Sequence, residues 1–331
     1  MNGEPSTELG TDTAADAPQG EARSAWERFL FAPQSTSAMT LIRIGWGAAA
    51  ATWATTLLPD VNPWMTEGEL RYPDNLAEGS WNILDVVEWK HAPLVACLLL
   101  IVTGITSMIG LKTRLSTAVA ALCMLSLQRT SPLVFNSGDL LLRQVGIAVA
   151  LAPCGLLLSV DAALARRRGG PAPSLLRAPW AQRFLQMNLA LGYLLSAWAK
   201  ARGTTWHDGT AVQRALRIVD VQRFEAPSWF IEQDDLLNLL TWGTLAFEAC
   251  FLVLVWNRRA KPWLLLVGIG LHVGIDLMFD VGFFTHALLL SYIAFLSPQT
   301  SDRILAWIEA RLPWRGRPRS TAPAAGEPAP T

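Results

Sequence analysis

The most reactive arrangement in this sequence is a lysine followed by a polar loop at the end of an apolar helix. The apolar run 184–198 leads to Lys200, and the chain then breaks at Gly203 into a loop that holds Trp206 and His207. A lysine at this depth lies where hydrocarbon gives way to water, and partial loss of water favours the neutral amine, which can act as a base. The alternative is that Lys200 is a snorkelling anchor and Trp206 a residue of the interfacial belt.

A histidine and an aspartate share one face of a later apolar helix. His272 and Asp276 are four residues apart, and Gly270 and Gly274 frame the histidine in a small-residue pattern that favours close helix contact. The pair could relay a proton or line a polar pocket, or it could form a structural hydrogen bond between packed helices. Only His286 offers a further ligand nearby, so we predict no metal site.

Four more polar residues lie in or beside apolar runs, where each is costly in lipid. Asp139 and Arg143 are again four residues apart, so they could neutralise each other in a low dielectric or bind a ligand. Glu248, in the middle of an apolar run, has no partner nearby in the sequence, and Arg143 is a candidate mate. Asn136 could point its carboxamide into a pocket.

Composition places the chain in the membrane class. Of its 331 residues, 51% are hydrophobic and 16% are charged, whereas soluble domains carry roughly 25% charge. The formal net charge is +0, so nothing suggests a nucleic-acid partner. The sequence contains no GxSxG or HExxH motif and no glycine-rich phosphate loop after a strand, so no motif supports a hydrolase or a nucleotide-driven reaction.

The apolar runs predict an all-α membrane bundle of about eight transmembrane helices, because most of them approach the ~20 residues that cross the hydrocarbon. We expect one membrane domain over residues 26–312, with disordered tails at 1–25 and 313–331. The predicted spans are 39–58, 93–111, 116–135, 140–160, 182–201, 236–256, 262–279 and 283–296.

Basic residues mark alternate connections between these helices. Clusters follow the second, fourth, sixth and eighth predicted spans, at 112–114, 166–168, 258–261 and in the C-terminal tail. The positive-inside rule therefore predicts a multi-pass protein of a bacterial-type inner membrane with both termini in the cytoplasm. It places the polar segments 61–91 and 202–233 on the outer side. Arg43, one turn inside the first span, is expected to snorkel to the head groups.

Four short motifs resemble those of a known family. They are RIGWG in the first span, N-x-G-D-x-L-L-R from Asn136, K-x-x-x-x-x-W-x-x-G from Lys200, and H…VGFF from His272. This pattern resembles the HTTM (horizontally transferred transmembrane) domain, the membrane part of vitamin K-dependent gamma-carboxylase. The resemblance covers about residues 36–297, nearly the whole predicted membrane domain.

The resemblance implies a base and a ligand. In the carboxylase the lysine similar to Lys200 deprotonates reduced vitamin K, which then reacts with oxygen to give a strong base for glutamate carboxylation. By the same likeness Asn136 and His272 match carboxylase residues and join Lys200 as candidate catalytic residues. Two positions depart from the family pattern: Ser137 replaces a histidine, and Thr285 replaces the proline of a G-M-F-P turn.

Three kinds of function stay open from the sequence. The first is a membrane enzyme that binds a lipophilic, quinol-like ligand in an outer-facing pocket with Lys200 as the base. The second is a non-enzymatic maturation or immunity partner, or a small-solute carrier; the third is a structural subunit whose polar residues only lock helices together. The cofactor, beyond a quinone or quinol, and any protein partner are not identified by the sequence. The candidate ligand-binding residues are Arg143, Trp206, Asp139, Asp276 and Glu248.

Overall fold

The computed structural model describes residues 24–66, 82–87, 89–131, 135–169 and 174–311, and these are mostly helical with almost no strand, as the all-α prediction expects. The predicted tails lie outside this set except for 24–25, as does much of the polar segment 61–91. The helices are α1 Ala25–Phe31, α2 Ser37–Leu57, α3 Ile83–Val86, α4 Ala92–Ile109, α5 Thr113–Thr130, α6 Ser137–Leu151, α7 Val160–Arg167, α8 Trp180–Lys200, α9 Thr204–His207, α10 Ala211–Ala215, α11 Ser228–Ile231, α12 Asp234–Leu254, α13 Lys261–Met278, α14 Phe284–Ile293 and α15 Pro298–Arg311. Short 3-10 or π-helical turns are η1 Leu58–Asp60, η2 Asn62–Thr66 and η4 Val219–Val221, and the strands are β1 Gln34–Ser35 and β2 Leu176–Arg177.

Each of the eight predicted spans corresponds to one helix: α2, α4, α5, α6, α8, α12, α13 and α14. The fourth differs most, because α6 ends at Leu151 instead of near residue 160. The next residue, Ala152, is extended and precedes Pro153. A residue before proline is driven out of the helical region, which explains the early end.

Three of these helices are long and apolar enough to cross a membrane by themselves: α4, α12 and α13, with mean hydropathy 2.3, 1.6 and 1.3. Only 33%, 28% and 17% of their residues are buried inside the protein, so most of their apolar surface faces outward. Such a surface belongs against lipid. α6 and α14 have 15 and 10 residues and are shorter than a standard span.

Arg43 of α2 is fully buried, so the prediction that it snorkels to the head groups is wrong. Its guanidinium donates to the carbonyl oxygens of Ser107 and Met108 at 2.5 and 2.7 Å, and to those of Cys154 and Leu158 at 3.2 and 2.6 Å. The first two carbonyls belong to the last turn of α4, where that of Ser107 also accepts from the Gly110 amide at 3.0 Å, and the others belong to the irregular stretch after α6. Arg43 therefore ties three chain segments together.

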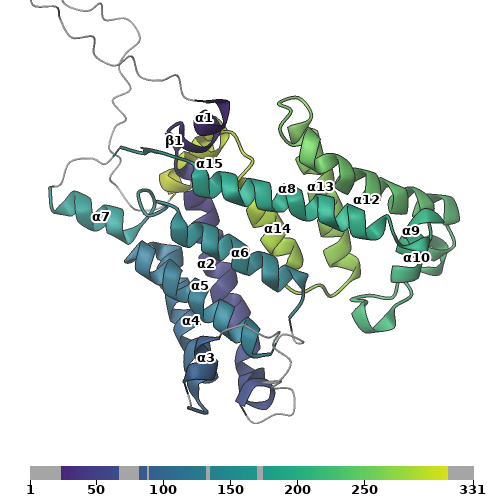
Figure 1. Cartoon of the computed structure of the whole chain (residues 1–331), viewed down its shortest axis with the longest axis horizontal. Coiled ribbons are helices and arrows are strands. Elements are labelled where there is room, and N and C mark those ends of the chain that lie inside the picture. The colour runs from purple at the N-terminus through teal and green to yellow at the C-terminus, as the bar shows by residue number, and fades with distance from the viewer. Residues whose placement is uncertain (1–23, 67–81, 88, 132–134, 170–173, 312–331) are drawn as a thin grey trace, which may run out of the picture.

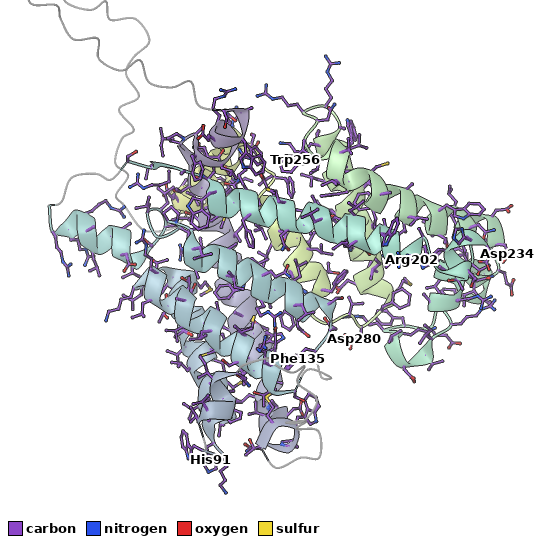
Figure 2. The ribbon with its side chains drawn as sticks, viewed as in Figure 1. His91, Phe135, Arg202, Asp234, Trp256 and Asp280 are labelled. Atoms are coloured by element: carbon purple, nitrogen blue, oxygen red, sulfur yellow. The ribbon has the colours of Figure 1, made fainter. Side chains whose placement is uncertain are left out.

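One end of the bundle gathers the N-terminal segment, the start of α8 and α15 (Figure 1). Gln34 of β1 pairs antiparallel with Arg177 of β2, and the hydroxyl of Ser37 donates to Asp302 of α15 at 2.5 Å. The turn after α12 lies at the same end, because the ring of Trp256 is 5.5 Å from that of Phe29 (Figure 2). The basic loop that precedes α8, the basic turn after α12 and the C-terminal helix α15 thus all contact the N-terminal segment at one end of the bundle.

A second group of helices, α8, α12, α13 and α14, is covered at its other end by residues 202–233, which we call the roof segment (Figure 1). This segment contains α9, α10, η4 and α11. Its Leu216 and Ala226 are buried with Leu237 of α12, and Met278 and Phe279 at the end of α13 pack against them. The roof segment therefore closes the space between α12 and α13.

Candidate functional site

A cavity of about 780 Å³ lies between α6, α8, α12, α13, α14 and the roof segment. Most of its wall is apolar, with Leu240, Leu271 and Phe284 among the lining residues. This volume is in the range of small-molecule sites, which are typically apolar with a few placed polar groups. Four of the predicted site residues line it: Lys200, Trp206, Glu248 and His272.

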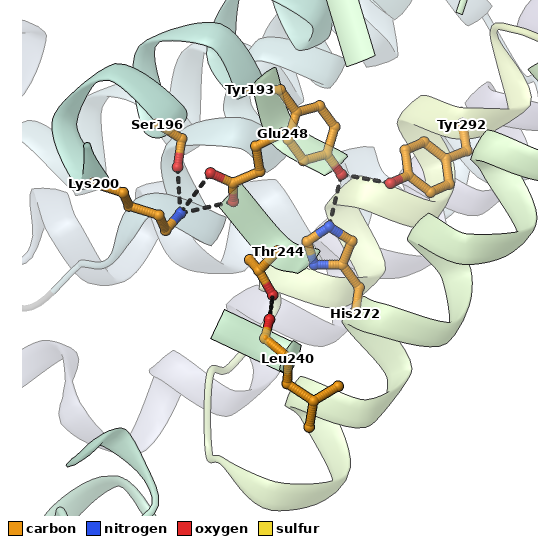
Figure 3. Close-up of polar contacts among 8 residues, drawn as sticks. All are labelled: Tyr193, Ser196, Lys200, Leu240, Thr244, Glu248, His272 and Tyr292. Carbon is orange, nitrogen blue, oxygen red and sulfur yellow. Dashed lines mark hydrogen bonds and ion pairs between the residues drawn. The ribbon is translucent and has the colours of Figure 1, made fainter. Parts of the chain in front are cut away.

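Lys200 forms an ion pair with Glu248 inside this cavity (Figure 3). Its Nζ lies 2.7 and 2.8 Å from the two carboxylate oxygens and donates to Ser196 Oγ at 2.6 Å. The amine is also 5.3 Å from the centre of the Trp206 ring, within cation–π range. Ser196 and Lys200 are one turn apart on α8, and the packing of α12 against α8 brings in Glu248. The expected Arg143–Glu248 pair is therefore replaced by Lys200–Glu248.

A second polar group joins His272 and Tyr193, which line the cavity, to Tyr292, which does not line it (Figure 3). The Tyr193 hydroxyl is 2.6 Å from His272 Nε2 and 2.5 Å from the Tyr292 hydroxyl. His272 is 3% exposed, and its Nδ1 has no hydrogen-bond partner in the described part of the chain. Whichever of the two ring nitrogens carries the proton, Nε2 is bonded to Tyr193 and Nδ1 is left without a partner. Nδ1 is also closed off from the cavity, so a ligand would reach it only after neighbouring side chains move.

The predicted pairing of His272 with Asp276 is not formed. Asp276 Oδ1 instead faces Arg223 of the roof segment at 4.0 Å, and Asp280 lies 3.6 Å from the same guanidinium. Asp276 is not among the residues that line the cavity. Its contact links the roof segment to the end of α13.

Gly270 and Gly274 do not make the close helix contact that their spacing predicts. Nothing lies within 4 Å of a Cβ placed on either residue, and both line the cavity, as does Gly192 of α8. The close approach occurs at Gly268, where a Cβ would collide with the Tyr292 hydroxyl. The three open glycines therefore leave space for the cavity.

Asn136 and Asp139 form the N-terminal cap of α6. Asn136 Oδ1 accepts from the amides of Gly138 and Asp139 at 2.7 and 3.2 Å, and the Asp139 carboxylate accepts from the Asn136 amide at 2.9 Å. Asp139 also accepts from Trp53 Nε1 at 2.7 Å, and within the described residues it makes no ion pair with Arg143. Neither Asn136, Asp139 nor Arg143 lines the cavity, although Ser137 does.

Three polar residues of the site were missed from the sequence: Tyr193, Ser196 and Tyr292. Tyr193 and Ser196 carry a signal, because they precede Lys200 by seven and four residues and so share its helix face. Tyr292 carries none, since 99 residues separate it from Tyr193. Among the described residues no group of three His, Cys, Asp or Glu side chains could hold a metal ion.

The fold and the cavity define the class: a helical membrane protein with a small-molecule-sized cavity that is lined by a partly buried charged pair. The model of the HTTM domain family matches residues 31–299, which is most of the chain. The protein therefore belongs to the HTTM domain family. Neither a curated protein nor a solved structure matches the chain.

Proposed function

We propose that this HTTM-family protein binds a lipophilic molecule with a quinol-like head group in the cavity and transfers a proton at that head group through Lys200 and Glu248. The observation that carries the proposal is the Lys200–Glu248 pair, which lines an otherwise mostly apolar cavity. Ionised groups are expensive in such a place and concentrate at functional sites. The choice of a quinol as the ligand comes from the resemblance to the membrane part of vitamin K-dependent gamma-carboxylase.

Lys200 and Glu248 would act as the base together, as the position of the proton in each state of the pair indicates. In the ion-paired state Lys200 already holds its proton, so the free acceptor is the Glu248 carboxylate. Lys200 becomes a base only after its proton passes to Glu248. Both routes end with protonated Glu248, an ammonium at Lys200 and an anionic ligand oxygen, which the ammonium stabilises.

A small movement of the neighbouring side chains would let His272 supply a second contact for the ligand. Its Nδ1 is unpaired, while Tyr193 and Tyr292 hold the other side of the ring. A quinol carries two oxygens on opposite sides of its ring and can use both His272 and the charged pair. Trp206, beside Lys200, would contact the ring face.

Four further predicted residues act indirectly in this proposal. Asn136 and Asp139 position the start of α6, whose Ser137 lines the cavity. Asp276 faces Arg223 of the roof segment, whose position is set mainly by backbone hydrogen bonds to the end of α13. Arg143 is half-buried on α6 and would act through that helix. We therefore treat Asn136, Asp139, Asp276 and Arg143 as positioning residues.

We further propose that all eight helices cross a bacterial-type inner membrane with the basic end in the cytoplasm. The gathering of the basic connections with α1 and α15 at one end supports this orientation. Lys200 lies at the opposite end of α8 from the contact of Arg183 with Phe29. The cavity would then open towards the outer leaflet.

The carrier alternative has less support. A carrier would need a path through the intramembrane residues Asp276, Glu248, Arg143 and His272, but of these four only Glu248 and His272 line the cavity. Asp276 faces the roof segment instead. Loss of proton-coupled uptake in Asp276→Asn proteoliposomes would favour the carrier.

The proposal is tested with a variant whose new side chain occupies the cavity without displacing neighbouring residues. Gly192→Leu adds a side chain where nothing lies within 4 Å, and Gly243→Leu on α12 is its matched control, because it is equally open but does not line the cavity. The measurement is binding of a 1,4-naphthoquinone with a short isoprenyl chain to protein in nanodiscs, by native mass spectrometry. We expect Gly192→Leu to lose binding and Gly243→Leu to keep it.

Equal binding by wild type and Gly192→Leu would place the ligand elsewhere and contradict the proposed site. Absence of binding to the wild type, in both the oxidised and reduced states, would contradict the quinol-like ligand. Melting temperatures of the two variants show whether either change has harmed the fold.

A further inference from the structure

The roof segment carries apolar residues on two sides. On the inner side, Val212, Leu216 and Phe230 line the cavity. On the outer side, Val219, Phe224 and Trp229 are 78%, 63% and 67% exposed. Exposed apolar residues that form a patch mark contacts with a membrane or with another protein.

Backbone hydrogen bonds fix the roof segment beside the end of a candidate membrane span. The Arg223 amide donates to the Met278 carbonyl at 2.9 Å, and the Asp280 amide donates to the Val221 carbonyl at 2.8 Å. These bonds place the exposed residues around Val219 and Phe224 at the last turn of α13.

Trp229 lies next to the start of another candidate span. It belongs to α11, which ends three residues before α12 begins at Asp234, and Leu236 in the first turn of α12 is exposed. The outer side of the roof segment is therefore continuous with the outward apolar faces of α12 and α13, which belong against lipid.

We propose that the roof segment docks on the membrane surface, with Val219, Phe224 and Trp229 inserted at the boundary between the head groups and the acyl chains. Aromatic residues at the ends of spans favour this boundary. The charge of the segment fits insertion into neutral lipid, because four arginines are balanced by four acids. The charged residues are Arg202, Arg214, Arg217, Arg223, Asp208, Asp220, Glu225 and Glu232.

This docking gives the cavity an entrance from lipid. The element that lines the cavity with Leu216 and Phe230 would itself lie on the leaflet, so a lipophilic molecule could reach the cavity rim without crossing bulk water. This consequence depends on the proposed function, whereas the docking does not.

The experiment attaches a fluorophore at Phe224→Cys and at a control position, Asp208→Cys. Asp208 is on the same segment, is exposed, and has the pKa of its carboxyl lowered by hydrogen bonds from the Thr210 hydroxyl and amide, so it belongs in water. Both variants carry Cys250→Ser, because Cys250 is exposed while Cys97, Cys123 and Cys154 are buried. The labelled protein is placed in phosphatidylcholine nanodiscs and quenched with nitroxide lipids or aqueous iodide.

We expect the Phe224 label to be quenched several-fold more by lipids with a nitroxide near the carbonyl than by iodide, with the reverse at Asp208. Strong iodide quenching at Phe224 with no lipid quenching would overturn the proposal, since the face would then be open to water. Protection from both quenchers would overturn it as well, because a protein surface would then cover the face. Quinone binding is measured separately, so its loss cannot be confused with either result.

Discussion

The helices around Arg43 and those around Lys200 use buried polar groups in opposite ways. In the first group, Arg43 donates to backbone carbonyls and Asp139 accepts from Trp53 and a backbone amide. In the second group, Lys200 and Glu248 pair with each other beside a cavity, and His272 keeps one nitrogen unpaired. Charge that satisfies the backbone holds segments together, whereas charge that faces a cavity is available to a ligand.

The largest expected effect comes from the first group. Arg43→Met would leave the carbonyls of Met108 and Leu158 without their side-chain donor, and each hydrogen bond to a charged group typically contributes about 1.5–3 kcal/mol. We expect a large fall in melting temperature in detergent. Arg166→Met, at an exposed arginine of α7, is the control and should change little. A melting temperature unchanged in Arg43→Met would show that the carbonyls find water or other donors.

The next effect separates stability from function at the charged pair. Lys200→Met leaves Glu248 unpaired and should destabilise the fold, though by less than Arg43→Met because the lysine side chain is 25% exposed. Adding Glu248→Gln removes the unpaired charge, so the double variant should recover much of the lost melting temperature. Proton transfer at a bound quinol should stay absent in the double variant.

Two results would contradict the prediction for the Lys200 and Glu248 variants. Proton transfer restored in the double variant would mean that the pair is not the base. A double variant no more stable than Lys200→Met would mean that the two charges are held by other groups, which a double-mutant cycle would measure as negligible coupling.

The smallest expected effect is at the contact between the roof segment and the end of α13. Arg223 is 41% exposed and lies 3.6 and 4.0 Å from Asp280 and Asp276, so its ion pairs contribute roughly 0.2–1 kcal/mol. Arg223→Ala should leave the melting temperature nearly unchanged but raise amide hydrogen exchange modestly over 216–230. A loss of protection as large as in global unfolding would show that the ion pairs, and not the backbone bonds to α13, hold the roof segment.

Local patterns predicted the helices and the family. Hydropathy located α2, α4, α5, α8, α12, α13 and α14 to within a few residues at most ends, because helix formation in apolar runs depends on neighbours in the sequence. The pattern from Asn136 to Asp139 is a helix cap and could have been recognised as one. The motifs at Arg43, Asn136, Lys200 and His272 indicated the HTTM family, which the family model confirms.

Only the tertiary structure decided which polar groups meet. Lys200 and Glu248 are 48 residues apart, and Tyr193 and His272 are 79 residues apart, so no local spacing joins them. Four-residue spacing suggested Asp276 for His272 and Asp139 for Arg143, yet a shared helix face does not choose the partner. The choice depends on which helix packs opposite that face, and here α12 against α8 and the roof segment against α13 determined it.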